Sequence, residues 1–189
     1  NFNKKTFFVI EASSYQLEYS RLFKSKYAVI LNISPDHLER HLTLQKYISA
    51  KFKLIENQSK NSLALINKNN NLIMSKIKRI KYKSKIVKVD TKLTDNFVKK
   101  LKNKNFLSGS NLENLSFVIK LSEILKVRNK NLFDAIKKFK GLKYRQQIIF
   151  KNKDLTIIND SPALGAETGF VVEKSLSVGT TPSATIAYT

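Results

Sequence analysis

A carboxylate and an imidazole each follow a short apolar run, in positions that are typical of a cation site. Glu11 comes directly after residues 6–10, and His37 follows residues 27–31 by six residues. Such short, continuously apolar runs predict strands that are buried on both faces of a parallel sheet. Since ligands bind at the carboxyl ends of these strands, we expect Glu11 and His37 to share one edge of the sheet and to hold a hard cation.

Each of these residues also has an ordinary alternative role. A single glutamate is most often a solvated acid or a helix cap, and a single histidine is most often structural. Lys51, 14 residues after His37, lies in a predicted helix where a surface role is equally ordinary. The parallel placement of Glu11 and His37 after two similar strands is what favours the metal site.

Strands and helices alternate along most of the chain. Further strands are predicted at residues 62–66 and 85–89, and helices at 13–23, 44–56, 111–125 and 131–139. A Ser and a Pro at residues 34–35 also suit the opening of a helix. This alternation predicts an α/β fold with a mainly parallel sheet. Residues 146–150 and 155–158 predict a separate strand pair across a polar turn.

The composition changes abruptly near Ser161. The preceding part holds 34 of the 35 Lys and Arg residues, whereas residues 161–189 hold one, together with three of the five Gly and two of the three Pro. This shift indicates foreign or frameshifted sequence, and a flexible native C-terminus is the alternative. Upstream of it, residues 141–142 follow a predicted helix and suit a C-cap and a domain joint.

The formal net charge is +21, which raises the question of nucleic-acid binding. The surplus is nearly all Lys, spread along the chain and interleaved with Asn, whereas nucleic-acid binders more often cluster Arg with aromatic residues. The absence of cysteine excludes disulfides and Cys catalysis, and no apolar run reaches the roughly 20 residues of a membrane span. We expect a cytoplasmic monomer with no nucleic acid and no membrane partner; a basic nucleic-acid-binding module is the alternative from another class.

Six motifs, taken together, resemble those of the Mur ligase family, in particular its D-glutamate-adding branch. They are residues 11–18 (EASSYQLE), 32–41 (NISPDHLERH), 47–51 (YISAK), 108–114 (SGSNLEN), 139–145 (FKGLKYR) and 158–161 (INDS). Each is weak alone, but their order and spacing over residues 6–161 make the resemblance specific. Other Mur ligases and folylpolyglutamate synthases share the central fold, and the SSYQL and GLKYR runs favour the D-glutamate-adding branch over them.

The resemblance implies an ATP-dependent ligase of peptidoglycan biosynthesis. Such an enzyme joins D-glutamate to UDP-N-acetylmuramoyl-L-alanine through an acyl phosphate. The implied fold is an incomplete α/β Mur ligase central ATP-binding domain over residues 1–141, with the start of a Rossmann-like C-terminal domain over 142–161. Residues 162–189 are then a tail outside the family, which we expect to pack loosely.

The resemblance also assigns roles to individual residues. Glu11 and His37 would hold Mg²⁺, and Lys51 would be carbamylated to an anion that supports the metal site. The implied ATP contacts are Asn111, Asn114, Arg145 and Asp160. The residues implied to face the substrate pocket are Ser13, Ser14 and Gln16.

The sequence departs from the family at both ends. The family's Gly-rich phosphate loop would lie before residue 1, so we interpret the N-terminus as cut. Pro162 stands where the family has Lys, and Tyr144 where it usually has His. The chain therefore carries about half of an active site, and the sheet edges left without partners should favour aggregation.

We predict that the isolated 189-residue chain does not catalyse the ligation, because groups that hold the phosphates and the amino acid are missing from it. The measurement is phosphate release with ATP, D-glutamate and UDP-N-acetylmuramoyl-L-alanine, with the full-length protein as the positive control. Amide formation by the chain alone would contradict the prediction.

Overall fold

The computed structural model describes residues 6–35, 38–92, 101, 103–106, 109–141, 147–151, 155–159, 170–174 and 185–187. The chain divides into two units, Asn1–Lys137 and Lys138–Thr189, and each is described by itself. The domain limits expected from the sequence stay a prediction.

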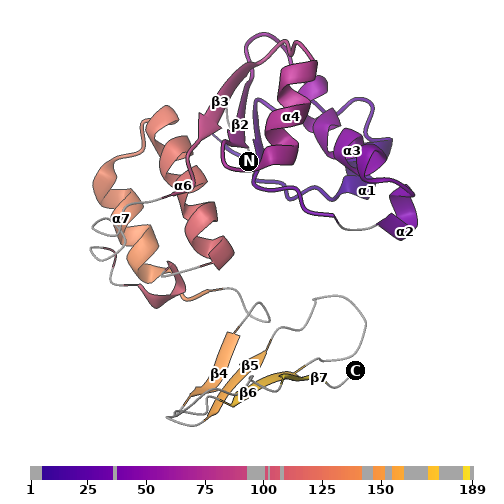
Figure 1. Ribbon diagram of the computed structural model, residues 1–189. Helices are drawn as coiled ribbons and strands as arrows, with labels where there is room; N and C mark the ends of the chain where they lie inside the picture. Colours follow the sequence, from indigo (N-terminus) through magenta and orange to yellow (C-terminus); the bar gives the residue numbers. More distant parts are fainter. Residues whose placement is uncertain are drawn as a thin grey trace. The chain divides into compact units, whose positions relative to one another are not determined.

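A three-stranded parallel sheet forms the centre of the first unit (Figure 1). Its strands are β1 (Tyr27–Ile30), β2 (Leu63–Asn67) and β3 (Lys85–Val89), in the order β1-β2-β3. Helices lie between successive strands along the chain, as parallel strands require a crossover connection. The predicted α/β fold with a parallel sheet is confirmed.

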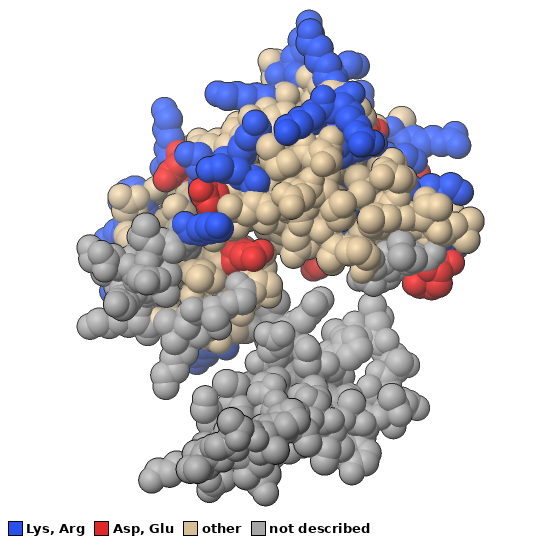
Figure 2. All heavy atoms as spheres, in the orientation of Figure 1, with Lys and Arg blue, Asp and Glu red and all other residues tan. Residues whose placement is uncertain are grey.

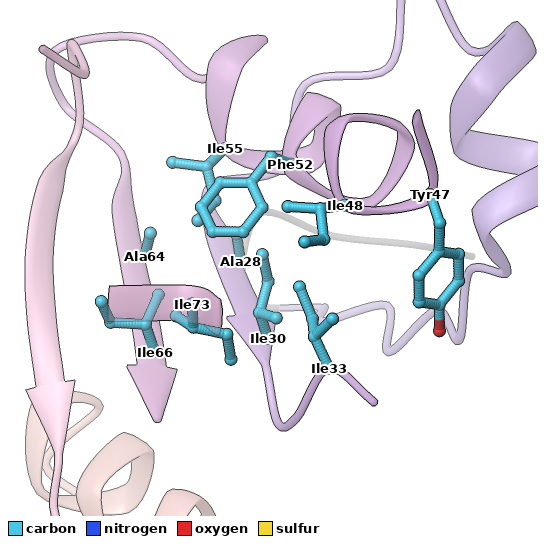
Figure 3. Packing of buried hydrophobic residues seen from close by; sticks show 10 residues of the cluster. All are labelled: Ala28, Ile30, Ile33, Tyr47, Ile48, Phe52, Ile55, Ala64, Ile66 and Ile73. Carbon is cyan, nitrogen blue, oxygen red and sulfur yellow. The ribbon is translucent and has the colours of Figure 1, made fainter. Parts of the chain in front are cut away.

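One face of this sheet packs on α3 (Leu44–Glu56) and α4 (Asn71–Arg79). Figure 3 shows Phe52 and Ile48 of α3 directed at the strands, beside Ile73 of α4. The strand residues in this cluster alternate along β1 and β2, and they are Ala28, Ile30, Ala64 and Ile66. The apolar residues at every second position of the strands thus pack against the apolar face of each helix.

The opposite face packs on α6 (Gly109–Ile124), chiefly through Phe117. The strand residues there are the intervening ones, Leu65 and Val89, which are also buried. A second helix, α7 (Asn129–Lys138), joins α6 in a cluster around Leu115. Helices therefore cover both faces, which explains why β1 is apolar throughout and β2 is apolar up to its last residue.

The sequence predicts most of these elements but misses one. The predicted helix over residues 44–56 coincides with α3, while α1 (Ser14–Tyr19) is shorter than the predicted helix over residues 13–23. No element is predicted between β2 and β3, where the structure has α4. Its Lys and Asn content resembles a loop, yet Asn70 caps it and Ile73 is fully buried.

The predicted first strand, residues 6–10, is wrong for this structure. These residues belong to no strand, and their apolar side chains face solvent, with Phe7 66% and Val9 99% exposed. A buried strand needs hydrogen-bonded neighbours and covered faces. Exposure on this scale leaves the faces of the segment uncovered, so an apolar run alone does not form a buried strand.

The second unit contains a four-stranded antiparallel sheet in the order β4-β5-β6-β7. The predicted strand pair is confirmed as β4 (Gln147–Lys151) and β5 (Leu155–Asn159). The expected loosely packed tail also contributes strands, β6 (Phe170–Lys174) and β7 (Thr185–Ala187), whose backbones pair in turn beyond β5. β-Branched residues in both strands, and the Phe of β6, suit such pairing.

The Rossmann-like arrangement expected for this unit stays a prediction. All three of its described strand pairings are antiparallel. Parallel pairing of β4 with β5 would need a crossover of a dozen or more residues, whereas only residues 152–154 connect them.

Asparagine side chains tie together the loops at the carboxyl ends of the parallel strands. The Asn67 amide donates to the Leu31 carbonyl oxygen at 3.0 Å, and the Asn70 amide donates to the Ile33 carbonyl oxygen at 2.9 Å. The backbone N–H of Thr91, just after β3, donates to Oδ1 of Asn69 at 3.0 Å. The loop that leads from β1 toward residue 37 is thereby attached to β2.

We predict that Asn67→Ala lowers the free energy of unfolding by about 1–3 kcal/mol, because it leaves the Leu31 carbonyl without its amide donor. Denaturant unfolding measures this. Asn61→Ala, at an exposed position, is the matched control and should stay within about 0.5 kcal/mol. Equal stability of the two variants would contradict the structural role of Asn67.

A second prediction concerns alkaline pH. Burial, and secondarily the negative charge of Glu56, raise the pKa of Tyr82 to about 12, whereas unfolded tyrosine titrates near about 10. The folded state holds this proton more tightly, so its stabilising effect is fully present below about pH 10 and is lost as the pH rises to about 12.

Tyr82→Phe should therefore flatten the loss of stability across that alkaline range. Its hydroxyl is buried without a hydrogen-bond partner in the described part of the chain, so the variant should not be less stable at pH 8 by more than about 1 kcal/mol. Unfolding curves across the pH range measure both effects. Identical alkaline slopes in the two proteins would show the assignment to be wrong.

Candidate active site

Three of the sequence motifs meet in one cluster of short elements. Helix α1 and helix α2 (Leu38–His41) both pack against α3, which carries the third motif. His41, the last residue of α2, lies at the centre of the cluster with only 3% of its surface exposed. The motifs are far apart in sequence, and tertiary packing brings them together.

The His41 imidazole makes polar contacts with α1. Its Nε2 lies 3.0 Å from the hydroxyl oxygen of Ser14, which is itself buried at 2% exposure. On its other side, Nδ1 lies 4.0 Å from Oε2 of Glu18. The buried imidazole thus has a hydrogen-bond partner, as buried polar groups require.

Two aromatic rings flank the same imidazole. Tyr15 of α1 is stacked on it, with centroids 5.5 Å apart and planes at 16°. Tyr47 of α3 is tilted against it at 5.5 Å and 52°. The Tyr47 ring in turn carries the ammonium group of Lys51, 5.1 Å from its centroid. His41 and Tyr47 therefore connect α1 with Lys51 through successive contacts.

Arg40 places a cation at the exposed rim of this cluster. Its Nη2 donates to the Tyr19 hydroxyl at 2.6 Å, and its guanidinium lies over the rings of Tyr15 and Tyr19 at 5.7 and 5.9 Å. Stacking of this kind suits the planar guanidinium. The arrangement holds an exposed positive charge in a fixed place.

Helix α3 also binds the C-terminal end of α1 through polar side chains. The Lys53 ammonium donates to the Glu18 carbonyl oxygen at 2.6 Å. The Asn57 amide donates to the Ser20 carbonyl oxygen at 3.2 Å. These bonds satisfy carbonyls at the end of a six-residue helix that has few turns of its own.

The residues predicted to face the substrate have local roles in this structure. Ser13 and Gln16 form a capping box, in which the Gln16 N–H donates to Ser13 Oγ at 3.2 Å and the Ser13 N–H to Gln16 Oε1 at 2.9 Å. Both are exposed, whereas Ser14 turns inward to His41. Substrate contact by any of the three stays a prediction, and Ser14 would have to act from within the fold.

The predicted metal ligands are only partly described. Glu11 is exposed and follows the segment that forms no strand, and His37 lies outside the described residues. Within the ranges that the structure describes, no three His, Asp or Glu side chains converge as metal ligands. The shared sheet edge expected for Glu11 and His37 therefore stays a prediction.

The predicted nucleotide contacts fall at the start of α6 and in the second unit. Asn111 is exposed and Asn114 partly buried, three residues apart in the first turns of α6. Residues at this spacing share one helix face, and a helix N-terminus favours anions such as phosphate. Arg145 and Asp160 lie outside the described residues.

Sequence reasoning gave no role to His41 or Arg40, although both lie within the motif at residues 32–41. Their spacing in the sequence does not mark them as functional residues. The partners of His41 come from helices that begin 27 residues before it and three residues after it. The one local signal is the turn that follows. Leu42 has a φ of 64°, and Thr43 then caps α3 by accepting from the Lys46 N–H at 3.2 Å.

Known proteins match this chain over most of its length. The Mur ligase middle domain matches residues 2–136. A UDP-N-acetylmuramoylalanine–D-glutamate ligase of Rickettsia felis is 34% identical over 176 residues, which cover 84% of this chain and 39% of that relative. Proteins of the same name from Rickettsia prowazekii and Fusobacterium nucleatum are 33% and 32% identical, covering 89% and 88% of this chain and 42% and 41% of their own length.

The chain belongs to the Mur ligase family, whose middle domain its first unit represents. It spans about two-fifths of the length of the curated relatives it matches. In the portion of the chain that the structure describes, no helix is long and apolar enough to cross a membrane.

We predict that Leu42→Gly stabilises the first unit by up to about 1 kcal/mol. The left-handed conformation costs a non-glycine residue roughly 1–2 kcal/mol, and Leu42 is 71% exposed, so little burial is lost. Leu42→Val, with a β-branched side chain, is the control and should be destabilising. Denaturant midpoints measure both, and a glycine variant less stable than the parent would refute the idea.

Proposed function

We propose that this chain is the central part of an ATP-dependent ligase that joins D-glutamate to UDP-N-acetylmuramoyl-L-alanine in peptidoglycan biosynthesis. Family membership supports an amide-forming ligase, and the names of the relatives support D-glutamate as the added residue. The observation that carries the proposal is the convergence of three family motifs around His41 and Lys51. Another Mur ligase activity is the nearest alternative. A cytoplasmic location stays a prediction.

In the proposed reaction, ATP phosphorylates the substrate carboxylate, and the D-glutamate amine then displaces phosphate from the acyl phosphate. Negative charge accumulates on the transferring phosphoryl oxygens, so fixed cations and donors stabilise the transition state. Asn111 and Asn114 of α6 would bind the nucleotide, and Arg145 and Asp160 stay proposed as nucleotide contacts. Ser13 and Gln16, which are exposed at the start of α1, would face the substrate.

Lys51 is proposed as the residue that becomes carbamylated. Its amine is held against the Tyr47 ring, and no carboxylate in the described residues forms an ion pair with it. An amine without a carboxylate partner is available to react with CO₂. The product would carry a negative charge where the parent lysine carries a positive one.

Mg²⁺ is proposed as the accompanying ion, with Glu11 and His37 as its ligands. The exposed Glu11 carboxylate is a donor of the type that this ion prefers. When bound, Mg²⁺ would neutralise charge on the phosphoryl oxygens. The described residues alone do not form its site.

The basic surface gives less support to a nucleic-acid-binding function. On the face that Figure 2 shows, Lys and Arg side chains spread over several elements of the first unit, with acidic residues near some of them. A broad positive potential of this kind attracts anionic substrates in general, ATP included. The alternative predicts salt-dependent binding to DNA or RNA.

We predict that Lys51→Ala in the full-length protein lowers kcat on the order of 10²–10³-fold, because the loss of its carbamate would weaken the metal site that stabilises transition-state charge, and losing one such stabilising group usually has an effect of this size. Amino-acid-dependent phosphate release measures this. Lys46→Ala is the matched control, because Lys46 is an exposed lysine of the same helix, and it should retain activity. Full activity of Lys51→Ala would refute the role of Lys51, and a preference for another amino acid would refute D-glutamate as substrate.

A further inference from the structure

His41 makes contacts that bulk packing alone does not explain. Its polar bond to Ser14 and its stack on Tyr15 come from α1, and its tilted contact with Tyr47 comes from α3. The first and last partners are 33 residues apart in sequence. A single buried imidazole thus joins the helix that carries the first motif to the helix that carries the third.

The polar bond determines which way the ring faces. An imidazole has two different edges, and burial penalises any edge nitrogen that lacks a partner. With Nε2 at 3.0 Å from Ser14 Oγ, Nδ1 is directed toward Glu18, and the ring plane is set parallel to Tyr15. An apolar ring of the same size would have no reason to keep this orientation.

One aromatic ring lies between His41 and Lys51. Tyr47 and Lys51 are four residues apart on α3, so their side chains share one face of the helix. Tyr47 is 3% exposed, and its ring contacts His41 and the Lys51 ammonium, with centroid distances of 5.5 and 5.1 Å. The His41 imidazole and the Lys51 nitrogen therefore contact the same Tyr47 ring.

We infer that His41 is a positioning residue, which sets the location of the Lys51 side-chain nitrogen through Tyr47 and couples it to α1. The relevance of His41 to catalysis rests on the proposed function of Lys51. The geometric coupling of His41 to Lys51 does not depend on that function. His41 itself is too deeply buried to contact substrate in this structure. Its contribution is to orient Lys51, the residue proposed to support the metal site.

The test uses two complementary variants of the full-length protein. His41→Gln keeps a group able to bond to Ser14 but removes the ring, and His41→Phe keeps a ring but leaves the Ser14 hydroxyl without its partner. Ile55→Val is the control for a general loss of packing. Ile55 is a fully buried residue of α3, the helix that carries Tyr47 and Lys51, and it lies outside the cluster around His41. This variant should cost about 0.5–1.5 kcal/mol of stability and leave the other readouts unchanged.

The first readout is independent of catalysis. In protein with isotope-labelled lysine, the ε-methylene protons of Lys51 should be shifted upfield by the Tyr47 ring, and Lys51→Arg assigns the signal. We expect this signal to move toward the position of a free lysine in His41→Gln and His41→Phe, and to stay in place in Ile55→Val. An unchanged signal in both His41 variants would overturn the inference.

The second readout is the division between kcat and KM. A misplacement of about 1 Å in an active site can cost on the order of 10²-fold, so we expect kcat to fall at least about tenfold in both variants, with little change in KM for ATP. A parental kcat in both variants would overturn the catalytic part of the inference. If the parent protein shows no ligase activity, the proposed function fails, and the Lys51 signal still decides whether His41 positions it.

Discussion

The burial of one face of α3 against the parallel sheet is the constraint on which the rest of the first unit depends. Ile48, Phe52 and Ile55 are all at most 3% exposed and pack on β1 and β2 (Figure 3). Each such side chain contributes roughly 1.5–3 kcal/mol when fully buried. A helix held along one face cannot rotate about its axis, so the directions of its other side chains are determined as well.

The other side chains of α3, whose directions are set in this way, form part of the candidate site. Tyr47 and Lys51 lie beside the buried stripe of α3, and Figure 3 shows Tyr47 at the end of the cluster. Helices α1 and α2 fill the space next to them, and His41 occupies the junction. A purely apolar junction would have been sufficient for packing. The polar bond between His41 and Ser14 adds a preferred orientation, which an active site requires more than a core does.

The carboxyl edge of the sheet shows the same combination of packing and polar bonds. Side chains of Asn67 and Asn70 hold backbone carbonyls of the segment after β1, and Thr91 bonds to Asn69. Loops are the natural carriers of functional residues, and a rigid scaffold positions them. Here the rigidity comes from amide side chains that replace missing backbone partners. A composition rich in Asn therefore has a structural use at this edge.

The sequence by itself determined the parallel α/β core, because continuous apolar runs and helical periodicity are local signals that survive without knowledge of partners. It also determined the family, because the six motifs retain their order. Tertiary structure alone decided that residues 6–10 are exposed, that Ser14 points inward and that His41 links α1 to Tyr47. Burial of a side chain depends on neighbours tens of residues away, and no local pattern in the chain encodes where those neighbours will lie.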